Sequence, residues 1–436
     1  MKISFFGAAE EVGRSCIMVT TKNSKILLDA GVKLGSDDQY PKITDEMLNE
    51  IDGIFISHAH LDHSGYLPHI MSAGYKNKVY ATKPTMELIQ VLLSDYMRLS
   101  KPSNVTKAGL ERLVKSYHVL EYKQAFKFRD LTVTFIPAGH ILGSALIKID
   151  DGEKSIIYTG DINIAKTKLF NGADLRNLSA DALITESTYG GESDIFKPQS
   201  ETINSMVKSI RETIKAGGKV IIPSFAVGRA QEVLLILDDY MNSGMIPKVT
   251  IYVDGMINKA MRIHRHNVIY CKKELQSKIL MSDYDPFKSD NFEMVEKKGT
   301  RTRIVNDDQS SIIVTTSGMI TGGPIMFYLS KLASNSMNKM ILVGYQAEGT
   351  MGRDLQEGAR EIEIDNKKIK IEMDVELYHL SAHADRHQLE TIPEKISGLK
   401  KIFILHGEIT KSSSLKSAFS DRYETIIPKL EESFTI

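Results

Sequence analysis

Short apolar runs in the first part of the chain predict β-strands. They are separated by Gly, Asn and charged turn residues, which is typical of strands with one or two buried faces. The runs cover residues 2–6, 16–20, 25–29, 78–81, 131–136, 145–149 and 155–158. Apolar residues at helical spacing predict helices over residues 68–72 and 85–99. Strands and helices that alternate in this way indicate an α/β fold built in layers.

The pattern changes near residue 192, where strand–helix units begin to follow one another. The strands of these units, and a further buried strand after them, cover residues 219–222, 249–253, 312–314 and 339–343. Consecutive strand–helix units favour a parallel sheet. We therefore expect a small α/β domain at residues 192–378, inserted into a larger fold formed by residues 1–191 and 379–436. The polar residues 278–310 predict a loop-rich connection.

Composition places the chain among soluble globular proteins. Apolar residues make up 42% of the chain, charged residues make up 25%, and the formal net charge is zero. A zero net charge gives no global field that attracts nucleic acid, so any basic surface must be local. The two cysteines, Cys16 and Cys271, exclude a disulfide framework and suit a reducing cytosol. No apolar run approaches the roughly 20 residues of a membrane span, so we expect a cytoplasmic protein with no membrane partner.

Candidate chemistry is concentrated in the stretch Ser57–His63, which directly follows an apolar run. Its spacing, H-x-H-x-D-H, offers three imidazoles and a carboxylate, which are good donors to divalent zinc. Because the whole chain has only 12 histidines, a chance surface cluster explains the stretch poorly. In an irregular turn, His58 and His60 can reach one ion while Asp62 and His63 reach a second. The stretch therefore predicts half of a two-metal hydrolytic centre.

Five more ligand-type residues stand at the ends of predicted strands. They are Asp29, His140, Asp161, Glu186 and His406. Strand ends on one edge of a sheet can hold converging ligands rigidly. Any one of the five alone is better explained as a turn or capping residue, because such residues are common there. Together with the histidine-rich stretch, they predict one shared site.

Six further motifs carry a resemblance to a known family. They are Gly7–Cys16, Val79–Thr85, Gly139–Ala145, Gly228–Glu232, Ser317–Gly323 and Gly344–Thr350. With the metal cluster, they make the chain similar to the metallo-β-lactamase superfamily and, within it, to the β-CASP nucleases. It resembles most the branch that contains the RNA-cleaving subunit of the eukaryotic cleavage and polyadenylation specificity factor and its archaeal and bacterial relatives. The resemblance implies a four-layer αββα body with an α/β β-CASP insert, and single-stranded RNA bound at an active site in the cleft between them.

The resemblance also implies a set of zinc ligands that is divided between two ions. The ligands of one ion are His58, His60 and His140, and those of the other are Asp62, His63 and His406. Asp161 is expected to bridge the two ions, and Asp29 to support the ligands from behind. Two zinc ions about 3.5–4 Å apart would share a water and lower its pKa to about neutrality, which supplies hydroxide at physiological pH.

By the same resemblance, His383 protonates the leaving oxygen while Glu186 holds its tautomer. The motif around it, Ser381–Asp385, also fits an ordinary helix start. By the same resemblance, His406 occupies the third β-CASP motif. The DNA-directed branch has a small aliphatic residue at this position. No ligand position is missing, which argues against the inactive relatives.

Substrate contacts are predicted in the insert. Ser317 and Gly318 precede a helix whose backbone N–H groups could bind a phosphate, and a plain strand–helix turn is an equal alternative. Arg229 begins a helix and could pair with the RNA backbone or form a salt bridge at a domain interface. A small basic group would either lie near the RNA or form a solvated helix face; its members are Arg262, His264 and Arg265.

These observations predict a zinc-dependent ribonuclease of RNA processing or decay. Endonuclease and 5′-to-3′ exonuclease activity both stay open. The alternatives are a DNA-directed β-CASP nuclease, a scaffold subunit, and a small-molecule metallohydrolase, which would leave Glu186 and His383 unexplained. A redox di-iron protein is disfavoured because His60 stands where that group has a carboxylate. Since relatives dimerise through their C-terminal segment, Tyr423–Ile436 is a candidate homodimer interface.

Overall fold

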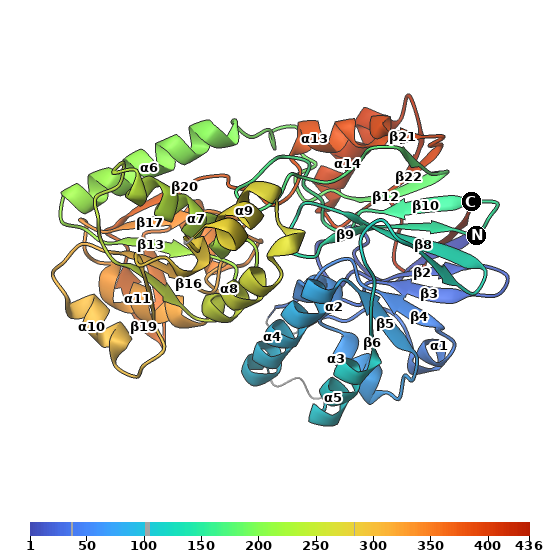
Figure 1. Cartoon of the computed structure of the whole chain (residues 1–436), viewed down its shortest axis with the longest axis horizontal. Coiled ribbons are helices and arrows are strands. Elements are labelled where there is room, and N and C mark those ends of the chain that lie inside the picture. The colour runs from blue at the N-terminus through green and yellow to red at the C-terminus, as the bar shows by residue number, and fades with distance from the viewer. Residues whose placement is uncertain (36–37, 101–104, 283) are drawn as a thin grey trace. The chain divides into compact units, whose positions relative to one another are not determined.

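A computed structural model shows the fold of residues 1–35, 38–100, 105–282 and 284–436 (Figure 1). The chain divides into two compact units. The first comprises Met1–Lys166, Asn171–Ile195 and His383–Ile436, and the second comprises Thr167–Phe170 and Phe196–Ala382. With this division His383 belongs to the first unit.

Two seven-stranded sheets form the first unit. The first sheet has the spatial order β24 (Ser433–Thr435), β1 (Lys2–Phe5), β2 (Ile17–Thr20), β3 (Lys25–Leu28), β4 (Gly53–Phe55), β5 (Lys78–Ala81) and β6 (Tyr117–Val119). The second has the order β23 (Glu424–Ile426), β22 (Lys401–Leu405), β12 (Ala182–Glu186), β10 (Ser155–Tyr158), β9 (Ala145–Asp150), β8 (Leu131–Pro137) and β7 (Ala125–Phe128).

Parallel pairing brings the candidate ligands to common edges. Strands β10, β12 and β22 are parallel neighbours, as are β3 and β4. Parallel strands end on the same side of a sheet, so the residues that follow them share that side. Asp161, Glu186 and His406 therefore lie at one edge of the second sheet. Asp29 and His58 lie at one edge of the first.

The core of the first unit lies between the two sheets. Alternate side chains of both sheets meet there, including Phe5, Phe55 and Phe403, all fully buried. The outer face of the second sheet is covered by α13 (Arg386–Thr391) and α14 (Ile409–Phe419), whose apolar residues join the strand residues in a separate cluster.

Helices also cover the outer face of the first sheet. Leu27, Ile54 and Val79 point to this face by strand alternation, and all three are fully buried. Figure 1 shows helices beside this sheet; the helices of this part of the chain are α1 (Asp45–Asn49), α2 (Leu61–Ser64), α3 (Leu67–Ser72), α4 (Lys83–Ser100) and α5 (Lys107–Ser116). The layers run helix, sheet, sheet, helix, which confirms the predicted αββα fold. A small parallel pair, β11 (Leu178–Ser179) and β21 (Ile396–Ser397), completes the unit.

The second unit is built on a six-stranded sheet in which all neighbours are parallel, as the strand–helix pattern predicted. Its spatial order is β15 (Phe292–Met294), β14 (Ile251–Asp254), β16 (Ile312–Thr315), β13 (Val220–Pro223), β17 (Lys339–Leu342) and β20 (Asp374–Leu377). The helices are α6 (Gln199–Lys215), α7 (Arg229–Asn242), α8 (Ile257–His266), α9 (Lys273–Met281), α10 (Thr300–Asn306), α11 (Pro324–Leu332) and α12 (Met351–Gln356). A hairpin of β18 (Glu361–Ile364) and β19 (Lys367–Lys370) packs into the same core.

The loop-rich connection predicted for residues 278–310 is wrong. Strand β15 adds to the edge of the sheet by pairing with β14, and α10 follows it. Ile304 of α10 is 1% exposed and packs into the core of the second unit. Packing of Ile304, with the partly buried Val305 beside it, holds this seven-residue helix although the surrounding sequence is polar.

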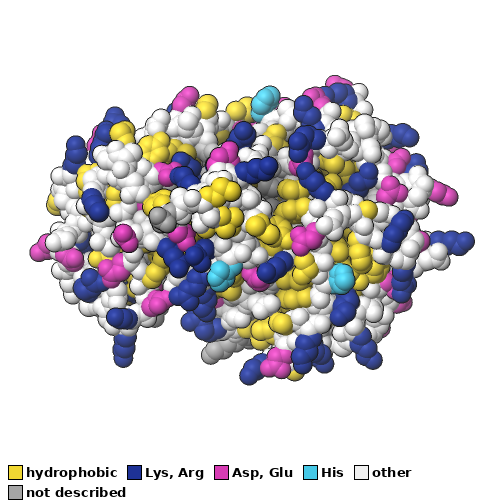
Figure 2. All heavy atoms as spheres, in the orientation of Figure 1, with side chains coloured by type: hydrophobic (Ala, Val, Ile, Leu, Met, Phe, Trp, Pro, Cys, Tyr) yellow, Lys and Arg dark blue, Asp and Glu magenta, His cyan; other side chains and the backbone are white. Residues whose placement is uncertain are grey.

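Both signs of charge appear on the surface. Figure 2 shows Lys and Arg side chains interspersed with Asp and Glu side chains on the visible face, as a net charge of zero predicts. Within the described ranges, no helix combines the length and the apolar composition that a bilayer span requires.

Candidate metal centre

The histidine-rich stretch is held by backbone hydrogen bonds to neighbouring loops. It follows β4 and runs into α2. The N–H groups of Ser15 and Ala30 donate to the carbonyls of Asp62 and His63, each at 2.8 Å. Gly31 allows this close packing, because a Cβ there would lie 1.7 Å from the Asp62 carbonyl oxygen. The ligand-type side chains therefore project from a rigid support.

One group of ligand atoms surrounds a point beside Asp161. His58, His60, His140 and Asp161 each offer one atom, and these atoms all lie within 4.8 Å of one another. His60 Nδ1 lies 3.1 Å from His140 Nε2, and Asp161 Oδ2 lies 3.4 Å from His58 Nε2 and 3.5 Å from His140 Nε2. Ligands of a tetrahedral zinc ion at 2.0–2.1 Å are about 3.3 Å apart, so these separations suit one such ion.

A second group uses the other oxygen of the same carboxylate. Asp161 Oδ1 lies 3.3 Å from His63 Nε2 and 3.4 Å from His406 Nδ1. Asp62 Oδ2 lies 3.3 Å from His406 Nε2. The structure thus brings all seven predicted ligands together, with Asp161 common to both groups.

The electrostatics of the cluster favour bound cations. Burial lowers the pKa of His58 and His140, and burial with His58 nearby lowers the pKa of His60 to about 4, so these rings are neutral and able to bind metal. Burial would also lower the pKa of His63, but Asp161 and Asp29 outweigh it and raise that pKa. A positive charge on the Nε2 side of His63, whether a proton or a metal ion, is therefore stabilised.

Several buried polar atoms in the cluster make no hydrogen bond within the described part of the chain. They are His58 Nε2, His63 Nε2, His406 Nε2 and Asp161 Oδ1. An unsatisfied buried polar atom costs about 1–3 kcal/mol. Buried nitrogen and oxygen atoms without hydrogen bonds, gathered in one cluster, are what a metal centre requires, so the residues fit metal ions.

Asp29 supports His63 through a buried hydrogen-bond network. Asp29 is 0% exposed, and its Oδ2 lies 2.6 Å from His63 Nδ1 and accepts from the hydroxyls of Ser57 and Tyr158, each at 2.7 Å. Its Oδ1 accepts from Ser57 N–H at 2.7 Å. A carboxylate on Nδ1 fixes the tautomer that leaves Nε2 for metal. The roles of Tyr158 and Ser57 were not predicted. Tyr158 lies three positions before Asp161 and Ser57 lies directly before His58, and these positions were the available signals.

Glu186 and His383 form a pair beside the cluster. His383 Nδ1 lies 3.0 Å from both oxygens of Glu186, and His383 Nε2 lies 3.9 Å from Asp161 Oδ2. Glu186 is fixed because its Oε1 also accepts from Ile162 N–H at 2.8 Å. Burial lowers the pKa of His383, but Glu186 and then Asp161 outweigh it and raise the pKa to about 9. Divalent ions beside Asp161 would lower this pKa, because like charges repel.

The predicted substrate residues lie in the second unit. Arg229 is buried at the start of α7. Ser317 Oγ accepts from Thr321 N–H at 3.0 Å, and the Gly318 carbonyl accepts from Gln346 Nε2 at 3.1 Å. Helix α11 begins with proline, and the next two N–H groups donate to the carbonyls of residues 316 and 323. A contact between these residues and RNA stays a prediction.

The basic group predicted on α8 is wrong for His264. This residue is fully buried, and its Nδ1 lies 2.8 Å from the Ala260 carbonyl oxygen. Burial lowers the pKa of His264 to about 4, so the ring is neutral. Arg262 pairs with Glu296 at 3.1 Å, and Arg265 pairs with Asp285. Only two of the three members therefore carry positive charge.

The C-terminal segment pairs within its own chain. Strand β23 adds to the second sheet beside β22, and β24 adds to the first sheet beside β1. Each of the two strands thus forms one edge of a sheet. Dimerisation through this segment stays a prediction.

Comparison with known proteins identifies the parts of the chain. A model described as the metallo-beta-lactamase superfamily domain matches residues 18–188, and one described as the Beta-Casp domain matches residues 230–355. A third, described as the Zn-dependent metallo-hydrolase RNA specificity domain, matches residues 368–428. These matches agree with the resemblance found in the sequence.

Curated relatives match almost the whole chain. The protein named transcription termination factor FttA in Methanothermobacter thermautotrophicus is 37% identical over 97% of this chain and 69% of its own length. The proteins of the same name in Methanocaldococcus jannaschii and Cenarchaeum symbiosum are 36% and 34% identical, over 94% and 100% of this chain and 67% and 71% of their own lengths.

A solved structure shares the fold. The crystal structure of a protein of unknown function from Enterococcus faecalis V583 matches with a TM-score of 0.61 and 14% identity, over 100% of this chain and 99% of that one. The predicted enzyme class, a metal-dependent hydrolase, is confirmed by the family matches. The chain belongs to the β-CASP family of the metallo-β-lactamase superfamily, a class of metal-dependent hydrolases that act on nucleic acids.

Proposed function

We propose that this chain is a zinc-dependent ribonuclease that hydrolyses RNA phosphodiester bonds at a centre of two zinc ions. The observation that carries the proposal is the juxtaposition of two features at Asp161. Its carboxylate is shared by two groups of metal-ligand atoms, and the His383–Glu186 pair lies beside it. A ligand cluster alone fits many hydrolases, whereas an adjacent proton donor suits a reaction with a poor leaving group.

Each zinc ion would have its own set of side chains. One set would be His58, His60 and His140, the other would be Asp62, His63 and His406, and Asp161 would belong to both. Support comes from the grouping of His63 with Asp161 and His406, and from the 3.3 Å between Asp62 Oδ2 and His406 Nε2. When bound, the ions would supply an activated water and positive charge against the phosphate. Asp29 would keep the proton of His63 on Nδ1, so that Nε2 faces the metal.

His383 would deliver the proton that the leaving oxygen needs. Its Nδ1 is hydrogen-bonded to Glu186, which places Nε2 on the side of Asp161 as the donor atom. The buried Glu186 carboxylate stabilises the imidazolium and so keeps the proton on the ring before the bond breaks. Proton transfer of this kind contributes about 10²–10⁴-fold to a rate.

RNA is proposed as the substrate on two grounds. The match to an RNA specificity domain spans residues 368–428, which include His383 and His406. His406 also stands where the DNA-directed branch has a small aliphatic residue. Arg229, Ser317 and Gly318 are the proposed phosphate contacts. Because relatives are named transcription termination factors, nascent transcripts are the first natural RNA to test.

Metal analysis and a cleavage assay on RNA and DNA of the same sequence test this function. We expect two zinc ions per chain and cleavage of RNA alone, lost on chelation and restored by zinc. His387→Ala is a matched control for His383→Ala, because His387 is exposed on α13. Cleavage of DNA alone would establish the DNA-directed alternative. Hydrolysis of small esters without nuclease activity would establish the small-molecule alternative.

The mode of attack is tested on the same preparation. Circular RNA has no 5′ end, so its cleavage would show endonuclease activity. Comparison of linear RNAs that carry a 5′-monophosphate or a 5′-triphosphate would show whether a 5′-to-3′ exonuclease activity depends on the 5′ group.

A further inference from the structure

One sequence motif, Val79–Thr85, has no place in the centre described above. In the structure it spans the end of β5 and the start of α4. Thr82 and Thr85 are both 0% exposed. Thr82 Oγ1 accepts from Thr85 N–H at 3.4 Å, which is an ordinary helix cap.

Capping does not account for the direction of the two hydroxyls. Thr82 Oγ1 lies 2.8 Å and Thr85 Oγ1 lies 3.0 Å from the carbonyl oxygen of Gly143, and the two hydroxyl oxygens are 2.9 Å apart. Each hydroxyl has one proton, so two of these three contacts are hydrogen bonds at any moment. Every such arrangement gives at least one proton to the Gly143 carbonyl.

Gly143 is shaped for this contact. Its φ is +83°, and a Cβ there would lie 2.6 Å from Thr82 Oγ1 and 2.7 Å from Thr85 Oγ1. Only glycine both adopts this backbone conformation readily and leaves room for the two hydroxyls. Any larger residue at position 143 would therefore place its Cβ against the two threonine hydroxyls that contact this carbonyl.

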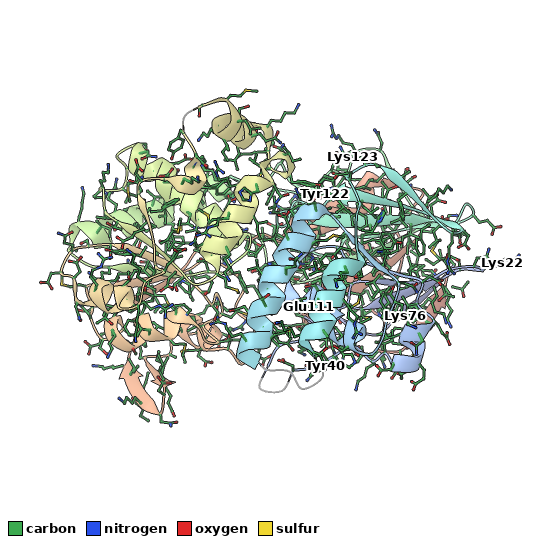
Figure 3. The ribbon with its side chains drawn as sticks, turned by 60° about the horizontal axis from the view of Figure 1, so that its bottom comes forward. Lys22, Tyr40, Lys76, Glu111, Tyr122 and Lys123 are labelled. Atoms are coloured by element: carbon green, nitrogen blue, oxygen red, sulfur yellow. The ribbon has the colours of Figure 1, made fainter. Side chains whose placement is uncertain are left out.

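The residue after Gly143 is hydrogen-bonded to the loop that carries His140, a predicted ligand of the metal centre. Ser144 follows Gly143, and its Oγ accepts from the N–H groups of His140 and Ile141, each at 3.2 Å. Tyr122, labelled in Figure 3, donates its hydroxyl proton to the Ser144 carbonyl at 2.8 Å. His140 Nε2 lies 3.1 Å from His60 Nδ1. The peptide held by the threonines therefore sets where the His140 ring stands.

We propose that Thr82 and Thr85 are a redundant pair of positioning residues that fix His140 for metal binding through the carbonyl of Gly143. This inference rests on the two-ion centre proposed above. Because either hydroxyl alone can donate to Gly143, the loss of one is compensated by the other. The loss of both leaves a buried carbonyl without a donor from this pair and releases the His140 loop.

Zinc retention under chelator competition tests the pair without any assay of activity. The double variant Thr82→Val/Thr85→Val should lose one of two zinc ions at a chelator concentration about 10–100-fold below that for the wild type, because partners that orient a ligand have effects of this size. The second zinc should stay. Each single variant should match the wild type, which makes the effect strongly non-additive.

Conservative variants separate positioning from packing. Thr82→Ser/Thr85→Ser keeps both hydroxyls and should retain both ions. Thr213→Val removes a buried hydroxyl in the second unit, bonded to the Ser209 carbonyl at 3.1 Å, and should also retain them. If the double valine variant does not fold, Gly143→Ala should release the same zinc ion.

Retention of both ions by the double valine variant, or by Gly143→Ala, overturns the inference. Equal losses in the two single variants, or a loss in the serine variant, also overturn it. A wild type with fewer than two zinc ions per chain overturns the proposed centre, and the inference falls with it. Two ions in the wild type and two in the double variant refute the threonine pair alone.

Discussion

Replacing Glu186 by glutamine in the metal-free protein tests the electrostatic coupling between Glu186 and His383, the proposed proton donor. Glu186 and Asp161 act against burial and raise the pKa of His383 from its ordinary 6.5 to about 9. That difference corresponds to about 3.4 kcal/mol in favour of the protonated ring. His383 Nδ1 lies 3.0 Å from each Glu186 oxygen, and a charge pair at that distance is worth about 5.5 kcal/mol at an effective dielectric constant near 20.

The attraction to Glu186 thus exceeds the whole net effect. Glutamine keeps an oxygen that can accept the Nδ1 proton, but it carries no charge. Burial of the ring remains, so the His383 pKa should fall by at least about two pH units, to about 7 or below.

The assay is an NMR titration of the histidine rings in the metal-free wild type, in Glu186→Gln and in Glu424→Gln. Glu424 is exposed on the edge strand β23, so Glu424→Gln serves as the matched control. In this variant the pKa of His383 should stay at about 9. A His383 pKa that stays above about 8 in Glu186→Gln would refute the reasoning.

The raised pKa of His383 also predicts how the stability of the metal-free protein changes with pH. Because the folded-state pKa lies above the unfolded value, the stabilisation is fully present below pH 6.5 and is lost as pH rises through about 9. The free energy of unfolding of the metal-free wild type should therefore fall over this range, by up to about 3 kcal/mol from His383. Denaturant titrations at several pH values should show a smaller fall in Glu186→Gln.

Three further substitutions test other parts of the site. His383→Ala should keep both zinc ions while RNA cleavage falls about 10²–10⁴-fold; loss of zinc would contradict its role as proton donor. Asp29→Asn removes the charged partner 2.6 Å from His63 Nδ1 and should weaken zinc binding about 10–100-fold by chelator competition, whereas unchanged affinity would count against it. Gly31→Ala places a Cβ 1.7 Å from the Asp62 carbonyl oxygen, so mass spectrometry should show loss of zinc and calorimetry a lower melting temperature. A zinc content equal to the wild type would refute that reasoning.

The ligand residues were visible in the sequence for a physical reason. Each follows an apolar strand, and neighbouring parallel strands end at the same edge of a sheet. A residue that directly follows such a strand can therefore be placed at that edge from the sequence alone. Asp161 and His406 are an example, since their strands both lie beside β12. The pairing of His383 with Glu186 could be predicted only from the family resemblance, because no local spacing in the sequence relates these residues.

The supporting residues could not be found in this way. Tyr158 reaches Asp29 across 129 positions, and Thr82 reaches Gly143 across 61. Such contacts depend on how the sheets pack, and a tyrosine or threonine in an apolar run looks like any strand residue. Helix α5 was also missed. Four of its ten residues are charged and only Gly109 and Leu113 are buried, so its composition resembles that of a polar connection.

The position of His406 has a consequence for the timing of synthesis. His406 is the last ligand-type residue of the cluster along the chain. It lies against the side chain of Thr188, which precedes it by 218 residues. At about 5–20 residues per second, a ribosome needs roughly ten to forty seconds to make the intervening chain. During that interval the earlier ligands are already synthesised, but β22 and the histidine that follows it are not. The proposed centre is therefore complete only after the whole insert has been translated, because His383 and His406 both follow it in the chain.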